Sequence, residues 1–219
     1  MRSRSEVIEQ LLQPGLIAVV RAGSAAQVPP IAEALVAGGF RAIEVTLTVP
    51  DALTAIRETA ARVGCRAVVG VGTVLKADQA AAAIDAGAEF VVSPITRAEI
   101  VGAAHAADRP VMLGAYTPTE AQAAYEAGAD FIKLFPADKL GPAYVKALRA
   151  PLPHLRIVPT GGVDLDTAAA FLRAGCAALG VGSALLRPEI LKAGDWAALT
   201  RLAMAFVEVV RPVARGKFG

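Results

Sequence analysis

The chain has 219 residues, with 22 Lys and Arg against 20 Asp and Glu, and 55% of it is hydrophobic, much of it alanine. This length fits one domain, whereas the near-neutral charge and the high hydrophobicity exclude a disordered chain and a general nucleic-acid-binding footprint. The charge-free run 174–186 contains several glycines and is shorter than the roughly 20 apolar residues that span a bilayer. We therefore expect no membrane-spanning helix and neither nucleic acid nor membrane as a partner.

The first ten residues are charged and contain no apolar signal-peptide core, which predicts a cytoplasmic protein. Cys65 and Cys176 lie far apart and form no CxxC pair. Because cytoplasmic cysteines are typically small reduced residues of the interior, we expect both to be buried and outside a disulfide.

In chain order, a short helix is expected at about 3–13 and a strand at Leu16–Val20. A sequence motif then recurs, in which the end of a helix-like run is followed by an Ala-Gly pair and a short apolar string. It occurs at 36–45, 85–94, 126–136 and 173–180. Glycine at a helix end takes the left-handed conformation without penalty. A short, nearly continuous apolar string is typical of a strand buried on both faces.

Weaker copies of the motif predict further strands at Ala67–Gly70, Pro110–Leu113 and Leu155–Val158. The expected helices lie at about 25–37, 51–63, 77–86, 97–107, 118–127, 142–149, 165–174 and 195–210. Eight strands that alternate with eight helices predict one domain over residues 1–219, an α/β fold of the single (β/α)8 TIM-barrel type. An open doubly wound sheet is the alternative, but no GxGxxG follows the first strand.

Two charges interrupt predicted strands. Lys133 lies within the apolar string 131–135, and Glu44 lies within the string 42–45. Such residues are almost never buried unless they are paired or functional. An unprotonated lysine can attack a ketone to form a Schiff base, and a nearby carboxylate can move the protons that this chemistry needs. The alternative is a structural ion pair inside the barrel.

Pairs of glycines follow the seventh and eighth predicted strands, within the segments 160–164 and 180–184. The loops after these strands commonly form a phosphate pocket in this type of barrel, with backbone amides and a helix N-terminus as donors. Glycines also make tight turns, so the two segments together are stronger evidence than either one. His105 and His154 form no HxH pair, and we expect no histidine-bound metal.

Several stretches carry a resemblance to a known family: 39–47, 71–75, 131–137, 159–163 and 182–183. Together they resemble the 2-keto-3-deoxy-6-phosphogluconate (KDPG) and 4-hydroxy-2-oxoglutarate (KHG) aldolases, over about residues 14–210. The resemblance implies a class I aldolase that uses neither metal nor cofactor. It implies a homotrimer whose small-molecule partners are pyruvate and a phosphorylated keto acid, with reversible cleavage of KDPG to pyruvate and D-glyceraldehyde 3-phosphate.

The resemblance also assigns roles to individual residues. It implies that Lys133 forms the Schiff base and that Glu44 is the general acid and base. The residues implied to contact the substrate are Arg21, Thr73, Pro94, Phe135 and Thr160, and those implied to bind its phosphate are Gly161, Gly162, Gly182 and Ser183.

One position departs from the family pattern. Members that act on KDPG often carry an arginine, linked to the substrate carboxylate, where this chain has Thr48. The galactonate epimer (KDPGal) and 4-hydroxy-2-oxoglutarate are therefore alternative substrates. Relatives that act on KDPGal suggest Arg21 as a compensating cation, whereas Thr160 favours KDPG, because those relatives often lack a threonine there.

Two more distant functions are weighed against an aldolase. A sugar-phosphate isomerase or epimerase would share the glycine segments but would be supported by Asp or His at the ends of strands 2, 3 and 6, where the sequence has neither. A non-catalytic phosphate-ligand binder would keep the pocket, but it would gain little from two buried charges at Lys133 and Glu44.

Overall fold

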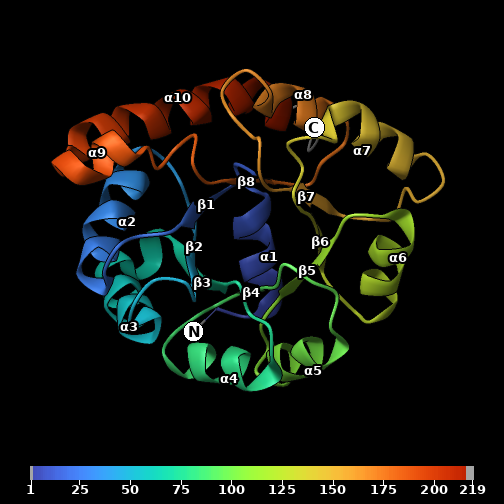
Figure 1. The fold of residues 1–219 in the computed structure, drawn as a ribbon, viewed down its shortest axis with the longest axis horizontal. Helices are drawn as coiled ribbons and strands as arrows, with labels where there is room; N and C mark the ends of the chain where they lie inside the picture. The colour runs from blue at the N-terminus through green and yellow to red at the C-terminus, as the bar shows by residue number, and fades with distance from the viewer. Residues whose placement is uncertain (1, 216–219) are drawn as a thin grey trace.

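The structure, a computed structural model, describes residues 2–215. Within these residues eight parallel strands form one sheet that curls into a barrel (Figure 1). The strands are β1 (Leu16–Val20), β2 (Ala42–Thr46), β3 (Val68–Gly72), β4 (Val91–Val92), β5 (Val111–Ala115), β6 (Phe131–Leu134), β7 (Ile157–Pro159) and β8 (Leu179–Val181).

The barrel closes between β7 and β8. Strands β1 to β7 pair in sequence order, and β8 pairs with β1. An isolated bridge joins Thr160 to Gly180, and the N–H of Ala177 donates to the carbonyl oxygen of Ile157 at 2.8 Å. An open doubly wound sheet is thereby excluded, and the predicted (β/α)8 TIM barrel is confirmed.

Helices alternate with the strands and surround the barrel (Figure 1). They are α2 (Val28–Ala37), α3 (Ala52–Val63), α4 (Ala77–Asp85), α5 (Ala98–Ala106), α6 (Pro118–Glu126), α7 (Gly141–Arg149), α8 (Ala168–Arg173) and α10 (Trp196–Arg215). Small residues let this outer ring pack closely. At Gly38, for example, a Cβ would lie 2.8 Å from the carbonyl oxygen of Thr200, where α2 meets α10.

The prediction differs from the structure mainly at element ends. Strands β3, β5 and β7 each begin one or two residues later than expected. A six-residue helix, α9 (Pro188–Ala193), was missed because so short a segment shows no hydrophobic period. Helix α10 runs to Arg215 instead of 210 and contains Pro212.

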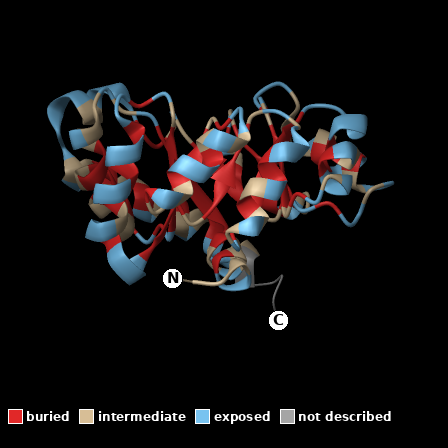
Figure 2. Ribbon diagram, turned by 90° about the horizontal axis from the view of Figure 1, so that it is seen from below, coloured by how far each residue is buried: buried red, intermediate tan, exposed pale blue. Residues whose placement is uncertain are grey.

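Side chains of each strand alternate between the helices and the barrel interior. At the amino ends of the strands, inward residues such as Val68, Phe90 and Phe131 form a separate apolar cluster with Val7 and Leu11. The last two belong to α1 (Arg4–Leu12), the predicted N-terminal helix, which closes this end of the barrel. In Figure 2, α1 projects from the barrel beside the N-terminus.

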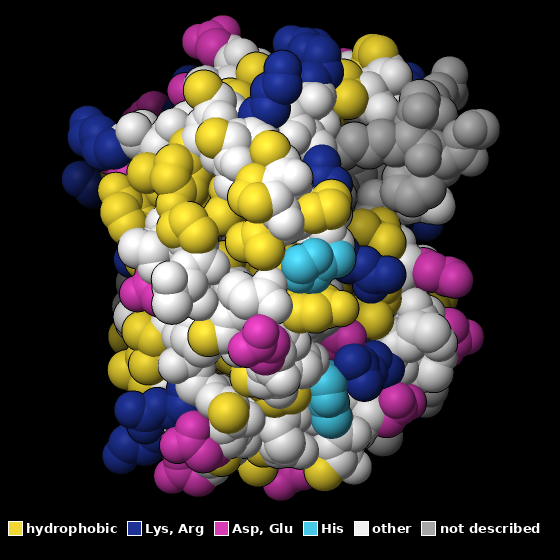
Figure 3. All heavy atoms as spheres, turned by 90° about the vertical axis from the view of Figure 1, so that its right-hand side faces the viewer, with side chains coloured by type: hydrophobic (Ala, Val, Ile, Leu, Met, Phe, Trp, Pro, Cys, Tyr) yellow, Lys and Arg dark blue, Asp and Glu magenta, His cyan; other side chains and the backbone are white. Residues whose placement is uncertain are grey.

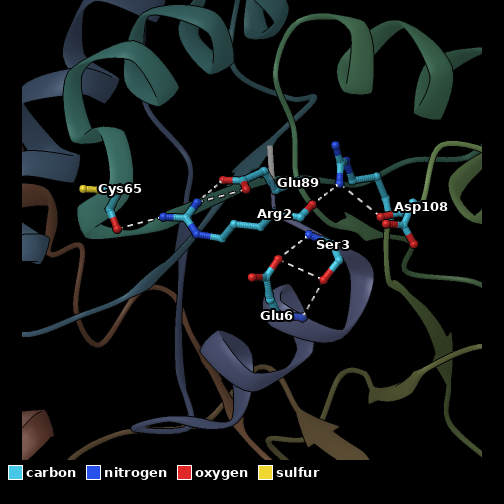
Figure 4. Close-up of polar contacts among 7 residues, drawn as sticks. Arg2, Ser3, Glu6, Cys65, Glu89 and Asp108 are labelled. Atoms are coloured by element: carbon cyan, nitrogen blue, oxygen red, sulfur yellow. Dashed lines mark hydrogen bonds and ion pairs between the residues drawn. The ribbon is translucent and has the colours of Figure 1, made fainter.

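Polar contacts fix the chain just before and within α1 (Figure 4). Arg2 Nη1 lies 2.7 and 2.9 Å from the two carboxylate oxygens of Glu89, and its Nη2 donates to the carbonyl oxygen of Cys65 at 2.7 Å. Ser3 and Glu6 form a capping box at the start of α1. The backbone and side-chain hydrogen bonds from Ser3 lower the pKa of Glu6.

The surface carries charges of both signs. On the side of α6 and α7, acidic and basic side chains are interspersed among hydrophobic ones (Figure 3). Cys65 is exposed on the 3-10 turn η2 (Gly64–Arg66), so the expectation of burial is wrong for it, whereas Cys176 is buried as expected. None of the helices in the described range combines the length and the apolar character needed to cross a membrane.

Candidate active site

Lys133 and Glu44 meet inside the barrel. They belong to β6 and β2, which lie on opposite sides of the ring (Figure 1). Their side chains meet across the barrel interior. The Nζ of Lys133 lies 3.4 Å from Oε1 of Glu44, and the two side chains are only 6% and 3% exposed. The structure therefore brings the two predicted charges into contact, away from bulk water.

A cavity of about 310 Å³ opens at the carboxyl ends of β1, β6, β7 and β8. Its lining includes seven of the residues that the sequence had singled out: Arg21, Phe135, Thr160, Gly161, Gly162, Gly182 and Ser183. The remaining wall is apolar and comes from Val19, Val163 and Leu186. A cavity of this size suits a small metabolite.

Phe135 connects this cavity to the buried pair. Its ring lines the cavity, and the Nζ of Lys133 lies 5.3 Å from the ring centre. Lys133, Glu44, Thr73 and Pro94 are not among the lining residues. The site thus has two adjoining parts, a buried pair of charges and a polar cavity that opens outward.

The loop between β7 and α8 is built around two glycines and an aspartate. Gly161 and Gly162 have φ angles of 89° and 71°, which only glycine adopts readily. The Asp164 carboxylate accepts hydrogen bonds from the N–H and the hydroxyl of Thr167, both at 2.8 Å. The same hydroxyl also lies 3.2 Å from the Gly162 carbonyl oxygen. These bonds hold the loop in place. The hydrogen bond from the Thr167 hydroxyl, and after it the one from the Thr167 N–H, lower the pKa of Asp164.

Thr73 and Pro94 follow β3 and β4, next to the buried pair. Thr73 has a φ of 62°, a strained value for a β-branched residue and one that recurs at functional sites. Pro94 packs its backbone against Gly114 of β5, which is level with Lys133 in the β5–β6 register. Both residues therefore lie at strand ends that border the charged pair.

Arg21 and Thr48 differ in their relation to the cavity. Arg21 follows β1 and, among the described lining residues, is the one that carries a charge. Thr48 is exposed, and its hydroxyl lies 2.7 Å from the hydroxyl of Thr46, which donates to the carbonyl oxygen of Val20. Arg21, and not position 48, thus places a positive charge in the lining of this cavity.

The two histidines have other partners. His105 Nε2 lies 3.1 Å from Asp130 Oδ2, and His154 Nε2 lies 3.0 Å from Gln122 Oε1. In the part of the chain that the structure describes, no three His, Cys, Asp or Glu side chains come together as metal ligands would.

Sequence reasoning missed two features of this site. The first is the anchor formed by Asp164 and Thr167, although an acidic residue three positions before a threonine at a helix start is a recognisable capping pattern. The second is a pair of inward strand glycines, Gly72 and Gly114, which occupy positions where a side chain would collide with Glu44 and with the backbone of Pro94. The Val-Gly-Val-Gly sequence of β3 is the signal that could have found the first of them.

Comparisons with known proteins agree with this geometry. A family model described as KDPG and KHG aldolase matches residues 7–202. The chain is 37% identical over 195 residues to the 2-dehydro-3-deoxy-phosphogluconate aldolase of Pseudomonas aeruginosa, covering 88% of each protein. It is 36% identical over 198 residues to the 2-dehydro-3-deoxy-6-phosphogalactonate aldolase of Escherichia coli, covering 90% of this chain and 94% of that one.

A solved structure is similar throughout. The KDPG aldolase of Legionella pneumophila, with pyruvate captured as a covalent carbinolamine intermediate, has a TM-score of 0.83 to this chain at 29% sequence identity. The match covers 91% of this chain and 97% of that one.

Proposed function

Because the chain belongs to the family of KDPG and KHG aldolases, and is thus an aldehyde-lyase, we propose that it is a class I aldolase that reversibly cleaves KDPG to pyruvate and D-glyceraldehyde 3-phosphate. The observation that carries this proposal is the buried 3.4 Å contact between Lys133 and Glu44 beside a cavity with an anchored glycine loop. A structural ion pair needs no adjoining cavity, and a phosphate binder needs no buried amine.

The reaction begins when the unprotonated Nζ of Lys133 attacks the C2 ketone to form a carbinolamine. Glu44 gives a proton to the departing hydroxyl, so that water leaves and an iminium forms. A base, Glu44 in its carboxylate form, takes the proton of the C4 hydroxyl as the C3–C4 bond breaks. The bond electrons move to the iminium and form an enamine, and the aldehyde departs. Protonation at C3 and hydrolysis of the new iminium release pyruvate and restore the amine.

The cavity supplies recognition of the two ends of the substrate. The bare backbone at Gly161, Gly162 and Gly182 and the hydroxyl of Ser183 are suited to the phosphate, because N–H groups and hydroxyls donate to its oxygens. Arg21 supplies the charge for an acidic group, which Thr48 does not. Thr73 and Pro94 border the pyruvyl part, and Thr160 faces the hydroxyl-bearing carbons.

Borohydride reduction in the presence of pyruvate tests the covalent step. We expect a pyruvyl mass on the peptide that contains Lys133. An active enzyme in which Lys133 stays unmodified would overturn the proposed chemistry.

Glu44→Gln should lower turnover by roughly 10²- to 10⁴-fold, the usual contribution of a general acid or base, with a much smaller change in pyruvate affinity.

The substrate itself is tested by cleavage rates on three compounds. We place KDPG first, because Thr160 lines the cavity beside Phe135. KDPGal and 4-hydroxy-2-oxoglutarate are the alternatives, because Arg21 and not position 48 carries the charge. A higher kcat/KM on either alternative would reassign the substrate and leave the aldolase chemistry intact.

We also propose that the protein is a homotrimer. Exposed apolar side chains from the first turn of α3 and from the next three strand-to-helix connections support an interface: Leu53, Leu75, Ile95 and Tyr116. A second cavity, of about 520 Å³ and lined by Leu47, Val49 and Leu53 among others, adjoins this rim. Light scattering should give three times the 22.4 kDa of one chain. Ile95→Asp should lower this mass if the rim forms the interface, and Met204→Asp, on α10, should not.

Each protomer is proposed to be one cytoplasmic domain. Helix α1 shares a core with the strand interior and α10 shares one with the outer layer, so we expect a single unfolding transition. Phosphorylated acids do not cross membranes unaided, which supports a cytoplasmic enzyme. Cell fractionation checks the location.

A further inference from the structure

We propose that Gly72 is a positioning residue of the reaction, because the space left by its missing side chain is where the Glu44 carboxylate lies. This inference rests on the proposed function and adds a residue that touches neither the lysine nor the substrate. The inference concerns where the barrel holds the Glu44 carboxylate for proton transfer. It does not concern whether Lys133 reacts with the substrate.

The carboxylate occupies the place of a Gly72 side chain. A Cβ at Gly72 would lie 2.6 Å from both Cγ and Cδ of Glu44 and would come closer still to Oε1. That same oxygen is the one that lies 3.4 Å from the Nζ of Lys133. Glu44 can therefore reach Lys133 along this path only if position 72 has no side chain.

Glu44 is the part that would move if a methyl group were added. The backbone of Gly72 is held by β2, since its carbonyl oxygen accepts from the N–H of Leu47 at 2.8 Å and its register partner is Thr46. Its φ lies outside the left-handed region, so alanine can adopt the same backbone. The colliding atoms, from Cγ to the carboxylate, all belong to the Glu44 side chain, which can move them away by taking another χ1 rotamer.

The next inward glycine of the same strand provides a matched control. A Cβ at Gly70 would lie 2.5 Å from ring atoms of Phe90, within the apolar cluster, and no Glu44 atom is among its nearest contacts. Gly70→Ala therefore adds the same methyl group to the same face of β3 and crowds the core instead of the carboxylate.

The consequence of a displaced carboxylate is specific. Gly72→Ala should lower kcat by about 10²-fold or more, since the contribution of a general acid or base is typically 10²- to 10⁴-fold. Pyruvate should still reduce onto Lys133 once the incubation is long enough for the iminium, whose formation Glu44 also assists, to accumulate, and its affinity should change little. The exchange of pyruvate methyl protons with deuterium, which requires proton transfer at C3, should slow in parallel with kcat. Gly70→Ala should lower the melting temperature more than it lowers either rate.

Glu44→Asp provides the decisive arm. In the wild-type background it withdraws the carboxylate by one methylene and should lower turnover. In the Gly72→Ala background the carboxylate has already left its position beside Lys133, so the same shortening should cost much less, and the double variant should stay close to the Gly72→Ala single variant. All rates are expressed per mole of Lys133 that borohydride can trap, which counts folded sites alone.

Two results would overturn the inference. One is a Gly72→Ala enzyme with wild-type kcat and exchange rate per trapped site. The other is a double variant whose loss equals the product of the two single losses, as independent positions would give. Failure of the proposed function looks different, because Lys133 of the wild-type enzyme would then not be trapped at all.

Discussion

The two ends of the barrel interior follow one alternation of inward residues but are filled in opposite ways. At the amino ends of the strands, the inward position is Val68 on β3, Met112 on β5 and Phe131 on β6. One inward step later β5 and β6 carry Gly114 and Lys133, and β2 carries Glu44. The first layer is filled by large apolar side chains, and the second holds the charged pair. Two residues along a strand thus separate a position that stabilises the fold from one that performs chemistry.

This contrast shows where the barrel tolerates unfavourable groups. Beneath the charged pair, α1 and the apolar cluster exclude water. Around the pair, the missing side chains of Gly72 and Gly180 leave the space that the side chains of Glu44 and Thr160 occupy. A buried ion pair contributes little net stability by itself. The apolar cluster at the amino ends of the strands must therefore contribute the folding stability that the charged layer does not. Substitutions at inward positions of the two layers therefore test whether one layer stabilises the fold while the other performs the chemistry.

The largest effect is expected at Lys133, on the chemical side of the division. Lys133→Met should abolish measurable cleavage, because no other amine is placed beside Glu44 in the described residues, and borohydride should trap no pyruvate. Circular dichroism should still report a folded barrel. Residual activity together with pyruvate trapped on a second lysine would contradict the prediction, because a lysine outside this layer would then form the Schiff base.

Phe131 lies one inward step below Lys133 and should behave in the reverse way. Phe131→Ala should lower the free energy of unfolding by about 3–5 kcal/mol, as is usual when a fully buried aromatic ring is removed. The rate per trappable site should stay within a few-fold of the wild type. Urea denaturation and active-site titration measure the two effects. A large loss of rate with little loss of stability would contradict the division between the layers.

Asp164 tests the open end of the site without touching the lysine. Asp164→Ala removes the acceptor that holds Thr167 and should raise KM for KDPG by roughly tenfold, since each such hydrogen bond contributes about 1 kcal/mol or more. Proton exchange of pyruvate, which has no phosphate, should be unaffected. Asp166→Ala is the matched control, because Asp166 contributes its backbone N–H to the same carboxylate, and alanine keeps that group.

The same residue gives a pH dependence. The pKa of Asp164 is lowered in the folded protein, mainly by the hydrogen bond from the Thr167 side chain. The stabilising effect of the carboxylate is therefore complete above the ordinary aspartate pKa of about 3.9 and is lost as the pH falls through the lower, folded value. The stability difference between wild type and Asp164→Ala should shrink over that acidic interval. A difference that grew there would contradict the assignment.

The smallest effect is expected at the closed end. Arg2→Ala removes the contacts with Glu89 and with the carbonyl oxygen of Cys65, and should lower the free energy of unfolding by about 1 kcal/mol or less. Turnover should not change, because these contacts lie at the end of the barrel remote from the cavity. Thermal melting and steady-state kinetics are sufficient. A change in KM would show that the two ends are coupled.

The charged residues of the site could be predicted from the sequence, whereas the glycines that accommodate them could not. Lys133 and Glu44 stand out because a charge inside an apolar string has few explanations, and Gly161 and Gly162 because they follow a strand and precede a helix. Gly72 does not stand out. A glycine within a strand usually signals weaker packing, and its significance depends on Glu44, 28 positions earlier in the chain and on another strand.

Local irregularities account for most other differences. Helix α9 contains six residues, too few for a period to be recognised. The exposure of Cys65 depends on the 3-10 turn that ends α3, which composition does not specify. The repeat of strand and helix was visible because every unit buries a strand on both faces. Strand ends are fixed instead by pairing with neighbours, which the sequence of one unit does not contain.

The bridge between Thr160 and Gly180 makes one residue responsible both for contact with the substrate and for the closure of the barrel. Thr160 lines the cavity, and it is also the residue through which the end of β7 meets β8. The side chain of Thr160 also fills the space beside Gly180 of β8, so a substitution selected there for a new substrate also alters the packing between β7 and β8. Adaptation at this position is therefore pleiotropic, and lineages that change substrate through Thr160 should carry compensating changes along β8.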